Sequence, residues 1–492
     1  MTLQKALETD NSGIGAGSHK PPLVLDLDGA LLRTDLLHEA AAGYVKSEPL
    51  GLFRLPQWLF RGKAALKREL NEHHNLDVEF LPVNEELVEY AAWEHAQGRL
   101  VGIATASDEL VARRVAKRFD FIDFVIASDG VTNLKGKAKA DALRERFPDG
   151  FAYAADAQAD LAVWKEANAI LLAGASARTA EAAGRLGKNI EARFDTPKLG
   201  LKGWAKAMRV HQWAKNALVF VPLILSGMAS NPMAVASALV AFFAMSFMAS
   251  GTYLINDLFD LADDRRHWTK KERPLPSGAL SIAKAVPASL GLLALALGMA
   301  ASLGWVALGL VATYLSLTLG YSLYIKRQPI IDAFALACLF TLRLGVGIAA
   351  VGAAPSAWLL VFSMFLFASL SFAKRQTEVQ KSARDGRKKV NGRGYNVDDA
   401  PMILAMGIST GMAAVLIMVL YLMNDAFNAN FYDAPLFLWA FPIVLFLWVS
   451  RIWLLSHREE LNDDPVAFAV RDRLSLMLGG VMGAAFLAGW LL

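Results

Sequence analysis

The sequence predicts two parts of different fold class: an N-terminal α/β domain built on a doubly wound parallel sheet, then an all-α membrane domain. Three observations support this prediction. In the first two hundred of the 492 residues, charged side chains recur every few positions, as they do in soluble proteins. Short apolar strands alternate there with helical stretches, which is typical of a doubly wound sheet. Nine later stretches are apolar and long enough to cross a bilayer.

Composition and charge limit the kinds of function and set the domain boundaries that we expect. The formal net charge of +4 is too small to indicate a nucleic-acid partner. The one cysteine, Cys338, excludes an internal disulfide and a cysteine-rich zinc site. Residues 1–20 are polar and rich in Gly and Ser, so we expect a disordered tail and no signal peptide. We expect the α/β domain at 21–175, a linker ending in an interfacial helix at 176–208, and the membrane domain at 209–492.

Each predicted strand of the α/β domain is followed by polar residues that could carry chemistry. The four strands are Leu23–Leu25, Leu100–Ala104, Phe124–Ala127 and Phe151–Ala155. The polar residues that follow them are Asp26, Asp28, Thr105, Lys139, Asp156 and Asp160. Because ligands of doubly wound sheets bind at the carboxyl ends of the strands, we expect these side chains to share one site.

The order and spacing of these motifs resemble those of the haloacid dehalogenase-like phosphatases. The resemblance implies that Asp26 attacks phosphorus to form an aspartyl-phosphate while Asp28 acts as general acid and base. It also implies that Thr105 and Lys139 hold phosphate oxygens. Mg²⁺ would be held at the same site, with Asp26, Asp28, Asp156 and Asp160 as the candidate ligands.

Three further features of this domain bear on the resemblance. The insert from Asp35 to about Pro82 is helical in pattern, and we expect it to form a small cap over the site. Ala30 and Ala155 depart from the family pattern, where a hydroxyl residue and a glycine are usual. Neither change removes a charged catalytic group, so retained phosphatase chemistry is favoured over a scaffold that has lost it.

The membrane domain is predicted as a nine-helix bundle. The nine stretches are Ala214–Gly227, Ala234–Ile255, Ala283–Leu303, Trp305–Tyr324, Ile331–Val351, Ser356–Phe372, Met402–Met423, Leu436–Leu455 and Leu474–Leu492. Lys and Arg gather in the loops after the second, fourth, sixth and eighth stretches, and the other loops hold few. The positive-inside rule then predicts a cytoplasmic N-terminal domain and an external C-terminus.

An aspartate motif stands at the inner end of the second stretch. Asp257, Asp260 and Asp264 are spaced i, i+3 and i+7, so on one helix their carboxylates share a face. Three anions on one stripe repel each other and call for a cation, and carboxylate oxygens that leave room for substrate phosphates suit Mg²⁺. We expect Asn256 to orient the cluster. The alternative is a solvated acidic helix end that pairs with the nearby residues Arg265, Arg266 and Lys270.

This motif, followed by the basic stretch that leads into Pro274-Leu275-Pro276-Ser277-Gly278, resembles the first signature of the UbiA superfamily. Family members that prenylate aromatic rings carry a second acidic motif after the sixth span. This chain has Lys374 and Arg375 there instead. The membrane half is more similar to the polyprenyl-phosphate phosphoribosyltransferases. The candidate substrate-binding residues that this similarity implies are Lys215, Asn216, Asn256, His267, Lys270, Arg273, Tyr321, Lys326, Lys374 and Arg375.

The resemblance implies an Mg²⁺-dependent enzyme of the bacterial inner membrane and cell envelope, which moves a 5-phosphoribosyl group from phosphoribosyl pyrophosphate to a polyprenyl phosphate. The cytosolic domain could then remove the ribose 5-phosphate of the product. Two alternatives stay open. One is a prenyltransferase that moves an isoprenoid from its diphosphate to an aromatic acceptor. The other is a membrane transporter or sensor, because acidic residues within membranes also mark ion pathways.

Overall fold

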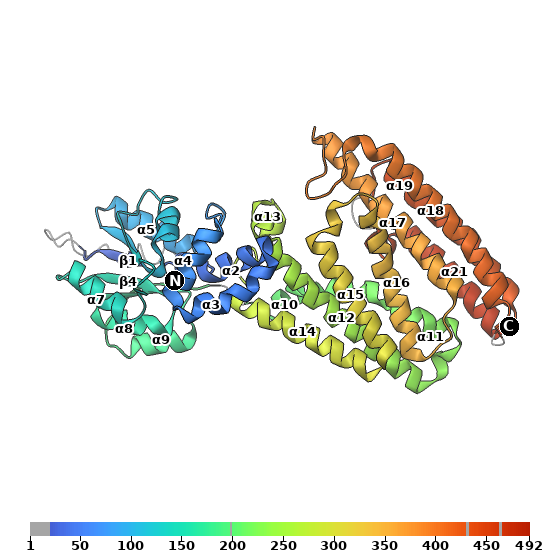
Figure 1. The fold of residues 1–492 in the computed structure, drawn as a ribbon, viewed down its shortest axis with the longest axis horizontal. Helices are drawn as coiled ribbons and strands as arrows, with labels where there is room; N and C mark the ends of the chain where they lie inside the picture. The colour runs from blue at the N-terminus through green and yellow to red at the C-terminus, as the bar shows by residue number, and fades with distance from the viewer. Residues whose placement is uncertain (1–19, 197–198, 430–431, 462–464) are drawn as a thin grey trace. The chain divides into compact units, whose positions relative to one another are not determined.

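The computed structural model describes residues 20–196, 199–429, 432–461 and 465–492 (Figure 1). The tail predicted at residues 1–20 lies outside these ranges except for Lys20. The contacts between residues divide the chain into two compact units. The first unit runs to Met208 and includes Tyr253–Ala288, and the second comprises Arg209–Thr252 and Ser289–Leu492.

The first unit contains a six-stranded sheet in which every neighbouring pair is parallel. The strand order is β3-β2-β1-β4-β5-β6, so the direction of winding reverses beside β1. The strands are β1 Leu23–Leu25, β2 Val101–Asp108, β3 Phe124–Ser128, β4 Ala152–Ala155, β5 Ala169–Ala173 and β6 Asn189–Phe194. Leu25 pairs with Ile103 of β2 and Ala154 of β4, which brings the carboxyl ends of these three strands together. Ligand sites of such sheets form at this place.

Helices cover both faces of the sheet, as Figure 1 shows. They are α5 Glu85–Ala96, α6 Glu109–Ala116, α7 Lys137–Arg146, α8 Leu161–Glu166 and α9 Ala177–Gly184, with the 3₁₀ turn η2 Gln158–Asp160 before α8. Leu23 and Leu25 pack into a core with α5 and α6, whereas Val24 packs into a second core with α7 and α8. Alternate side chains of a strand point to opposite faces, so a strand buried on both sides is apolar throughout.

The insert after β1 is helical, and it has a small core of its own. It comprises α2 Leu36–Ser47, η1 Pro49–Arg54, α3 Leu55–Phe60 and α4 Lys63–His73. Tyr44, Trp58 and Leu70 pack together between these helices. The side chain of Asp35 accepts hydrogen bonds from the backbone N–H groups of Leu37 and His38, which fixes the start of α2.

The sheet continues beyond residue 175, where we placed the domain boundary. The stretch predicted as a linker contains α9 and β6, and β6 pairs with β5 at the edge of the sheet. Only α10 Leu201–Ala207 lies in the part where we expected an interfacial helix. Sequence reasoning missed β6 because it is an edge strand with polar Asn189, Glu191 and Arg193 at alternate positions, and so it lacks an apolar run.

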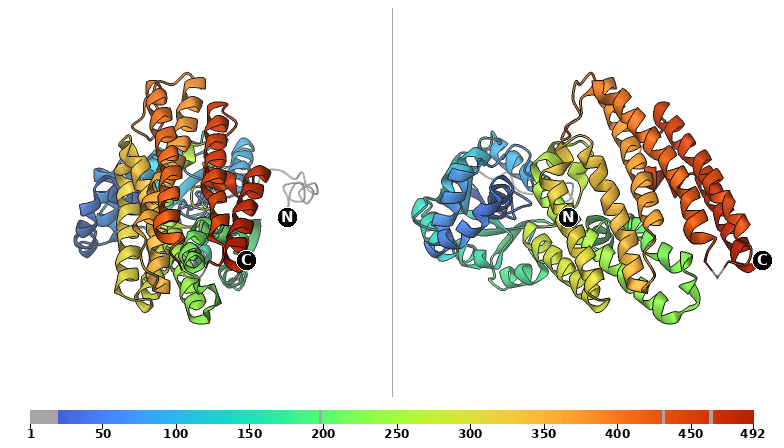
Figure 2. Two further views of the ribbon diagram at one scale, coloured as in Figure 1. Left: turned by 90° about the vertical axis from the view of Figure 1, so that its right-hand side faces the viewer. Right: turned by 45° about the vertical axis from the view of Figure 1, so that its right-hand side comes forward.

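Within the described residues, eight helices are long and apolar enough to cross a membrane. They are α12 Pro232–Phe259, α14 Ile282–Ser302, α15 Trp305–Leu323, α16 Ile331–Val351, α17 Ala357–Arg384, α18 Ala400–Tyr421, α19 Ala440–His457 and α21 Arg473–Leu491. Shorter helical segments connect them: η4 Met228–Ser230, α13 Leu261–Arg266, η5 Lys270–Glu272, η6 Ile325–Arg327, η7 Val397–Asp399, η8 Leu422–Ala426, η9 Pro435–Trp439 and α20 Pro465–Ala469. Figure 2 shows the long helices after α15, yellow to red, running side by side.

The predicted count of nine spans is not confirmed, because the first predicted span, Ala214–Gly227, is not one of these eight helices. It lies in the 3₁₀ segment η3 Val210–Phe220 and the five-residue helix α11 Val221–Leu225. Two residues account for the difference. Pro222 lies in the first turn of α11, where its missing N–H donor is tolerated, so the α-helix starts at Val221 and not earlier. Asn216 is buried, and its amide bonds to side chains of other helices.

Candidate active sites

The first candidate site lies at the carboxyl ends of β1, β2 and β4. Asp26 follows β1, Asp156 follows β4, and Asp160 lies in η2 just before α8. One carboxylate oxygen of each lies within 4.8 Å of the others. Mg²⁺ takes oxygen ligands at about 2.1 Å, so two ligands on opposite sides lie about 4.2 Å apart. The spacing of these three carboxylates therefore fits Mg²⁺.

A buried lysine holds this acidic group together. Lys139 Nζ lies 2.8 Å from Asp26 Oδ1 and 3.5 Å from Asp160 Oδ1, and it donates a hydrogen bond to the Tyr153 hydroxyl at 2.7 Å. The Tyr153 hydroxyl in turn donates to Asp160 at 3.2 Å. Burial alone would lower the pKa of Lys139, but the attraction of Asp26 and Asp160 outweighs it and raises the pKa. The lysine is thus a fixed positive charge beside Asp26.

The three acids are too many for one lysine to neutralise. Burial, together with repulsion by Asp26 and Asp160, raises the pKa of Asp156 to about 8. Burial and repulsion by Asp26 raise the pKa of Asp160 to about 6. Carboxyl groups with such raised pKa values bind protons when no metal is present, and a divalent cation would displace those protons. This excess of negative charge supports the fit to Mg²⁺.

Asp28, two residues after Asp26, lies in a different environment. It accepts a hydrogen bond from the Ser107 hydroxyl, and another from the backbone N–H of Leu36 at 2.8 Å. Burial and the nearby charge of Asp35 raise the pKa of Asp28 to about 7. A carboxyl group with this pKa can both give and take a proton near neutral pH, as a general acid and base must.

The loop after β1, which ends at Gly29, lies close to Asp156, the residue that follows β4. Gly29 has φ +84°, and a Cβ at this position would lie 2.5 Å from Asp156 Oδ2. Only glycine fits here, because it tolerates positive φ and leaves space for the carboxylate. Gly29 therefore lets the loop after β1 lie directly against the Asp156 side chain.

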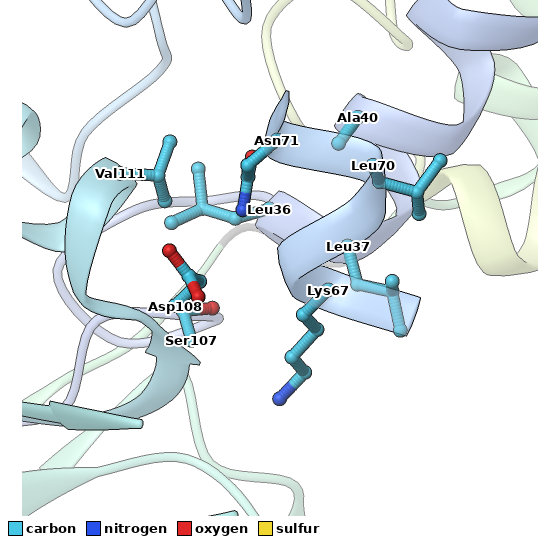
Figure 3. Close-up of a pocket in the computed structure, with 9 residues that line it drawn as sticks. All are labelled: Leu36, Leu37, Ala40, Lys67, Leu70, Asn71, Ser107, Asp108 and Val111. Carbon is cyan, nitrogen blue, oxygen red and sulfur yellow. The ribbon is translucent and has the colours of Figure 1, made fainter. Parts of the chain in front are cut away.

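Sequence reasoning missed two side chains that complete this site, Ser107 and Lys67. Figure 3 shows Lys67 on α4 and Ser107 at the end of β2 lining one small cavity. Lys67 donates hydrogen bonds to the Ala106 carbonyl and to Asn133 Oδ1, so the insert reaches the carboxyl end of β2 and the loop that follows β3. Thr105 is fully buried, and its hydroxyl oxygen accepts from the Ser107 N–H at 3.0 Å. The serine two residues after Thr105 was the available signal.

The second candidate site is the aspartate motif, which belongs to the same compact unit as the sheet. The expected single helix ends at Phe259, and α13 begins at Leu261. Asp257 and Asp264 are nevertheless brought together. Arg273 Nη1 lies 3.3 Å from Asp257 Oδ1 and 2.6 Å from Asp264 Oδ2, and both acids are buried. Asp260 lies at the break and accepts a hydrogen bond from Asn256 at 3.1 Å.

Asp257 and Asp264 converge on one guanidinium nitrogen, so their carboxylates could hold a cation at this point. Arg273 Nη1 occupies this point, and its side chain is 30% exposed. A carboxylate pair that meets at one point suits Mg²⁺. Lys270 adds a weaker contact, with Nζ 3.5 Å from Asp264 Oδ1.

The arginines that directly follow the motif have carboxylate partners in the N-terminal part of the chain. Arg265 pairs with Glu39 of α2, and Arg266 pairs with Asp77. Of the three partners in the alternative of an acidic helix end, Lys270 does contact Asp264, whereas Arg265 and Arg266 pair with Glu39 and Asp77. His267 contacts Thr269, within its own loop.

The basic candidates of the second unit divide into a buried cluster and partly buried residues. Arg375 is 1% exposed, and its Nε lies 2.7 Å from Asp332 Oδ2. It also pairs with Glu378 and donates to the Tyr321 hydroxyl at 3.3 Å. A guanidinium held by two carboxylates is poorly placed to bind a substrate phosphate, so Arg375 is better suited to position the end of α17. Lys374, the preceding residue, is only partly buried.

Asn216 takes part in a second buried cluster. Its side chain accepts a hydrogen bond from Arg343 Nε at 2.8 Å and donates to the Ser246 hydroxyl at 3.0 Å. Lys215, its neighbour, lies over the ring of Phe340, with Nζ 5.9 Å from the ring centre. Lys326 lies in η6, just before α16, and is partly buried.

The membrane half matches a known family. The sequence pattern of the UbiA prenyltransferase family matches residues 218–478, slightly more than half of the chain. A solved structure described as a UbiA homolog from Archaeoglobus fulgidus bound to DMAPP and Mg²⁺ is similar, with 17% identity and a TM-score of 0.46. It covers 58% of this chain and 97% of its own.

Similar curated proteins fall into two groups: those matched over most of their own length and those matched over part of it. The protein y4nM of Sinorhizobium fredii is 36% identical over 95% of this chain and 90% of its own length, and the nodulation protein NoeC of Azorhizobium caulinodans is 34% identical over 59% of this chain and 94% of its own. The decaprenyl-phosphate phosphoribosyltransferase of Corynebacterium glutamicum is 33% identical over 39% of this chain and 59% of its own length.

Proposed function

This chain belongs to the UbiA prenyltransferase family, and from that premise we propose that its membrane half transfers a 5-phosphoribosyl group from phosphoribosyl pyrophosphate to a polyprenyl phosphate. The observation that carries the proposal is the meeting of Asp257 and Asp264 at one cationic atom, Arg273 Nη1. Such a carboxylate pair suits Mg²⁺ on a leaving pyrophosphate.

Two further observations favour phosphoribosyl transfer over prenyl transfer. Just after the apolar stretch of α17 stands Lys374, where the prenylating members of the family carry acids. The decaprenyl-phosphate phosphoribosyltransferases are 31–34% identical to part of this chain. A donor with phosphate at both ends suits a site that has cations as well as acids, because the cations hold one phosphate.

The reaction needs no protein nucleophile. The bond between C1 of the ribose and the pyrophosphate oxygen breaks, and the bonding electrons leave with pyrophosphate. An oxygen of the lipid phosphate then forms the new bond to C1. Asp257 and Asp264 would hold Mg²⁺, with Asp260 and Asn256 beside them, and the ion would supply positive charge to the departing pyrophosphate. Lys215, Lys270, Lys326 and Lys374 would hold the 5-phosphate and the lipid phosphate. Positioning of bound reactants can contribute roughly 7 to 11 kcal/mol.

For the α/β domain we propose a haloacid dehalogenase-like phosphatase that removes the ribose 5-phosphate of this product. Asp26 would attack phosphorus while the sugar oxygen leaves with a proton from Asp28. Water would then hydrolyse the aspartyl-phosphate, with Asp28 as base. The gathering of Asp26, Asp156 and Asp160 within 4.8 Å supports the proposal, and Lys139 would hold a phosphate oxygen.

The proposed location is the inner membrane of a bacterium, with the α/β domain in the cytoplasm. The Lys and Arg residues of alternate loops support this orientation through the positive-inside rule. Phosphoribosyl pyrophosphate is a soluble, charged donor, so a cytoplasmic site would also be the one that it can reach.

A comparison of two labelled donors tests the membrane reaction. Membranes containing the chain receive either radiolabelled phosphoribosyl pyrophosphate or a radiolabelled prenyl diphosphate, with Mg²⁺ and polyprenyl phosphate or an aromatic acceptor. We expect label in the lipid product only from phosphoribosyl pyrophosphate. Label transferred only from the prenyl diphosphate would establish the prenyltransferase alternative. If neither donor reacted and Asp257→Asn abolished an ion flux, the protein would be a transporter.

A further inference from the structure

A single cavity of about 1260 Å³ in the first unit is lined by both functional parts of the chain. On one side, its walls include Asp26, Asp28 and Lys139 of the candidate phosphatase site. Its walls also include residues 278–284, which follow the aspartate motif and enter the membrane helix α14. Ligand sites for small molecules usually measure about 300–1,000 Å³, so this cavity is larger than a free sugar phosphate needs.

The cavity wall from the membrane half is packed closely against the phosphatase loop. Gly278 has φ +76°, and a Cβ there would lie 2.5 Å from the backbone oxygen of Arg33. Arg33 belongs to the loop that connects Asp28 to α2, and its own N–H bonds to the Pro82 carbonyl at 2.8 Å. The two segments therefore form one continuous surface.

A buried ion pair holds this wall in place. Arg265 Nη1 and Nη2 lie 3.0 and 2.6 Å from the carboxylate oxygens of Glu39, and Arg265 Nε donates to the Pro276 carbonyl at 3.1 Å. The Thr34 hydroxyl also donates to Glu39. Because both charged side chains are buried and hydrogen-bonded in two directions, the loop around Pro276 is fixed to α2.

The chemistry of the cavity wall matches an amphiphilic anion. Leu199, Trp204 and Ile282 give it an apolar part beside the start of a membrane helix. Arg33 adds to the cavity wall a cation that has no anionic partner in the described part of the chain. Among the described residues, Arg33 has no carboxylate within ion-pair distance, and its buried Nε atom has no hydrogen-bond partner. A buried N–H without a partner is costly, so a ligand anion is the natural partner for it.

We infer that the phosphatase site takes its substrate from the membrane, as a lipid-linked sugar phosphate, and that Arg33 binds the second anionic group of this substrate. The inference rests on the proposed phosphatase function and assigns the residues that recognise its lipid-linked substrate. The terminal phosphate lies at Asp26, Arg33 pairs with the phosphodiester that joins sugar to lipid, and the first isoprenoid units lie against Trp204 and Ile282. One water is consumed, the bond between phosphorus and the sugar oxygen breaks, and inorganic phosphate is released.

The test uses the purified full chain in lipid nanodiscs, with Mg²⁺ and without phosphoribosyl pyrophosphate, so that the membrane reaction cannot contribute. Three synthetic substrates are compared: farnesyl-phosphoryl-5-phosphoribose, ribose 5-phosphate and p-nitrophenyl phosphate. We expect kcat/KM for the farnesyl-linked substrate to exceed that for ribose 5-phosphate at least about tenfold, because it gains one charge-assisted pair and apolar contacts.

Variants of one arginine sharpen the test. Arg33→Met is expected to reduce the preference for the farnesyl-linked substrate about tenfold, and Arg33→Lys to retain part of it. Arg54→Met is the matched control. Arg54 is an exposed arginine of the helical insert that follows the Arg33 loop, and it pairs with Glu48 outside the cavity. Its preference should equal that of the wild type.

The outcomes separate this inference from the function on which it rests. Equal kcat/KM for the farnesyl-linked substrate and ribose 5-phosphate would overturn the membrane-borne substrate and leave the phosphatase intact. A preference that survives in Arg33→Met would overturn the role of Arg33. Hydrolysis of none of the three substrates would overturn the proposed phosphatase and this inference with it.

Discussion

The two acidic sites of this protein achieve convergence of carboxylates in different ways. Asp26 and Asp156 are held by the register of two adjacent strands, and Lys139 lies between the acids as a permanent partner. Asp257 and Asp264 come from two helices separated by a break, and both contact one guanidinium nitrogen of the partly buried Arg273. At the carboxyl ends of the strands, the backbone fixes the positions of the carboxylates. At the helix end, their positions depend on which cation lies between them.

Replacing the proposed nucleophile, Asp26, should have the largest effect on activity. This effect should be confined to the site at the carboxyl ends of the strands, which we call the sheet site. We expect Asp26→Asn to reduce phosphate release at least about 10³-fold, because an amide cannot attack phosphorus. Transfer of label from phosphoribosyl pyrophosphate to lipid should stay at the wild-type rate. Equal loss of both activities would contradict the separation of the two sites.

Removing one acid of the membrane motif should have the next largest effect, now confined to the other reaction. Asp257→Asn or Asp264→Asn is expected to slow lipid labelling about 10²- to 10³-fold, because charge that stabilises the departing pyrophosphate is lost. Asp260→Asn should cost less, about tenfold, because its carboxylate already bonds to Asn256.

Asp263 provides the matched control for this series. It belongs to the same motif, but its side chain is 72% exposed and pairs with Lys46. Asp263→Asn should leave lipid labelling unchanged. A loss as large as that of Asp257→Asn would show that total charge matters rather than the meeting of two particular carboxylates.

The sheet site was more predictable from sequence than the helix site. Leu23–Leu25 followed by Asp26, and Ala152–Ala155 followed by Asp156, are apolar runs that end in acids, and strand ends place such residues together. The break at Asp260 was not predictable, since i, i+3, i+7 spacing fits an unbroken helix equally well. The partners of Arg265 and Arg375, Glu39 and Asp332, are distant in sequence, and no local pattern reveals such pairs.

The link between the two sites can be broken at the buried ion pair. Glu39→Gln should lower the stability of the first unit by about 3–5 kcal/mol, because Arg265 would be left buried without its anion. Thermal unfolding of the purified chain measures this. Combining Glu39→Met with Arg265→Met should recover most of the loss.

Glu48→Gln is the control for the ion pair, because Glu48 lies at the end of the same helix and pairs with Arg54 at the surface. It should change the unfolding temperature little, as exposed pairs contribute about 0–1 kcal/mol. If Glu39→Gln were equally harmless, the pair would not hold the wall of the cavity.

The smallest predicted effect is a pH dependence of the sheet site. The metal-free carboxyl groups of Asp156 and Asp160 have pKa values raised to about 8 and about 6. A raised folded pKa means that the folded state binds more protons than the unfolded state, so metal-free stability falls as pH rises from about 4 to 8. Because Mg²⁺ competes with these protons, its affinity should rise by about tenfold per pH unit between pH 6 and 8, where Asp156 is the group that still holds its proton.

Mg²⁺-dependent thermal shifts at pH 6, 7 and 8 measure this affinity. Asp156→Asn should remove most of the pH dependence, because it removes the carboxyl group with the higher pKa. An affinity independent of pH in the wild-type chain would mean that the carboxylates do not bind the ion.

One doubly labelled donor tests the whole account most directly. Phosphoribosyl pyrophosphate with ¹⁴C in the ribose and ³²P in the 5-phosphate is given, with polyprenyl phosphate and Mg²⁺, to the wild-type chain and to Asp26→Asn. The account predicts equal ¹⁴C and ³²P in the lipid made by Asp26→Asn, and ¹⁴C lipid with ³²P released as inorganic phosphate by the wild type. Lipid without ¹⁴C from either protein would contradict it.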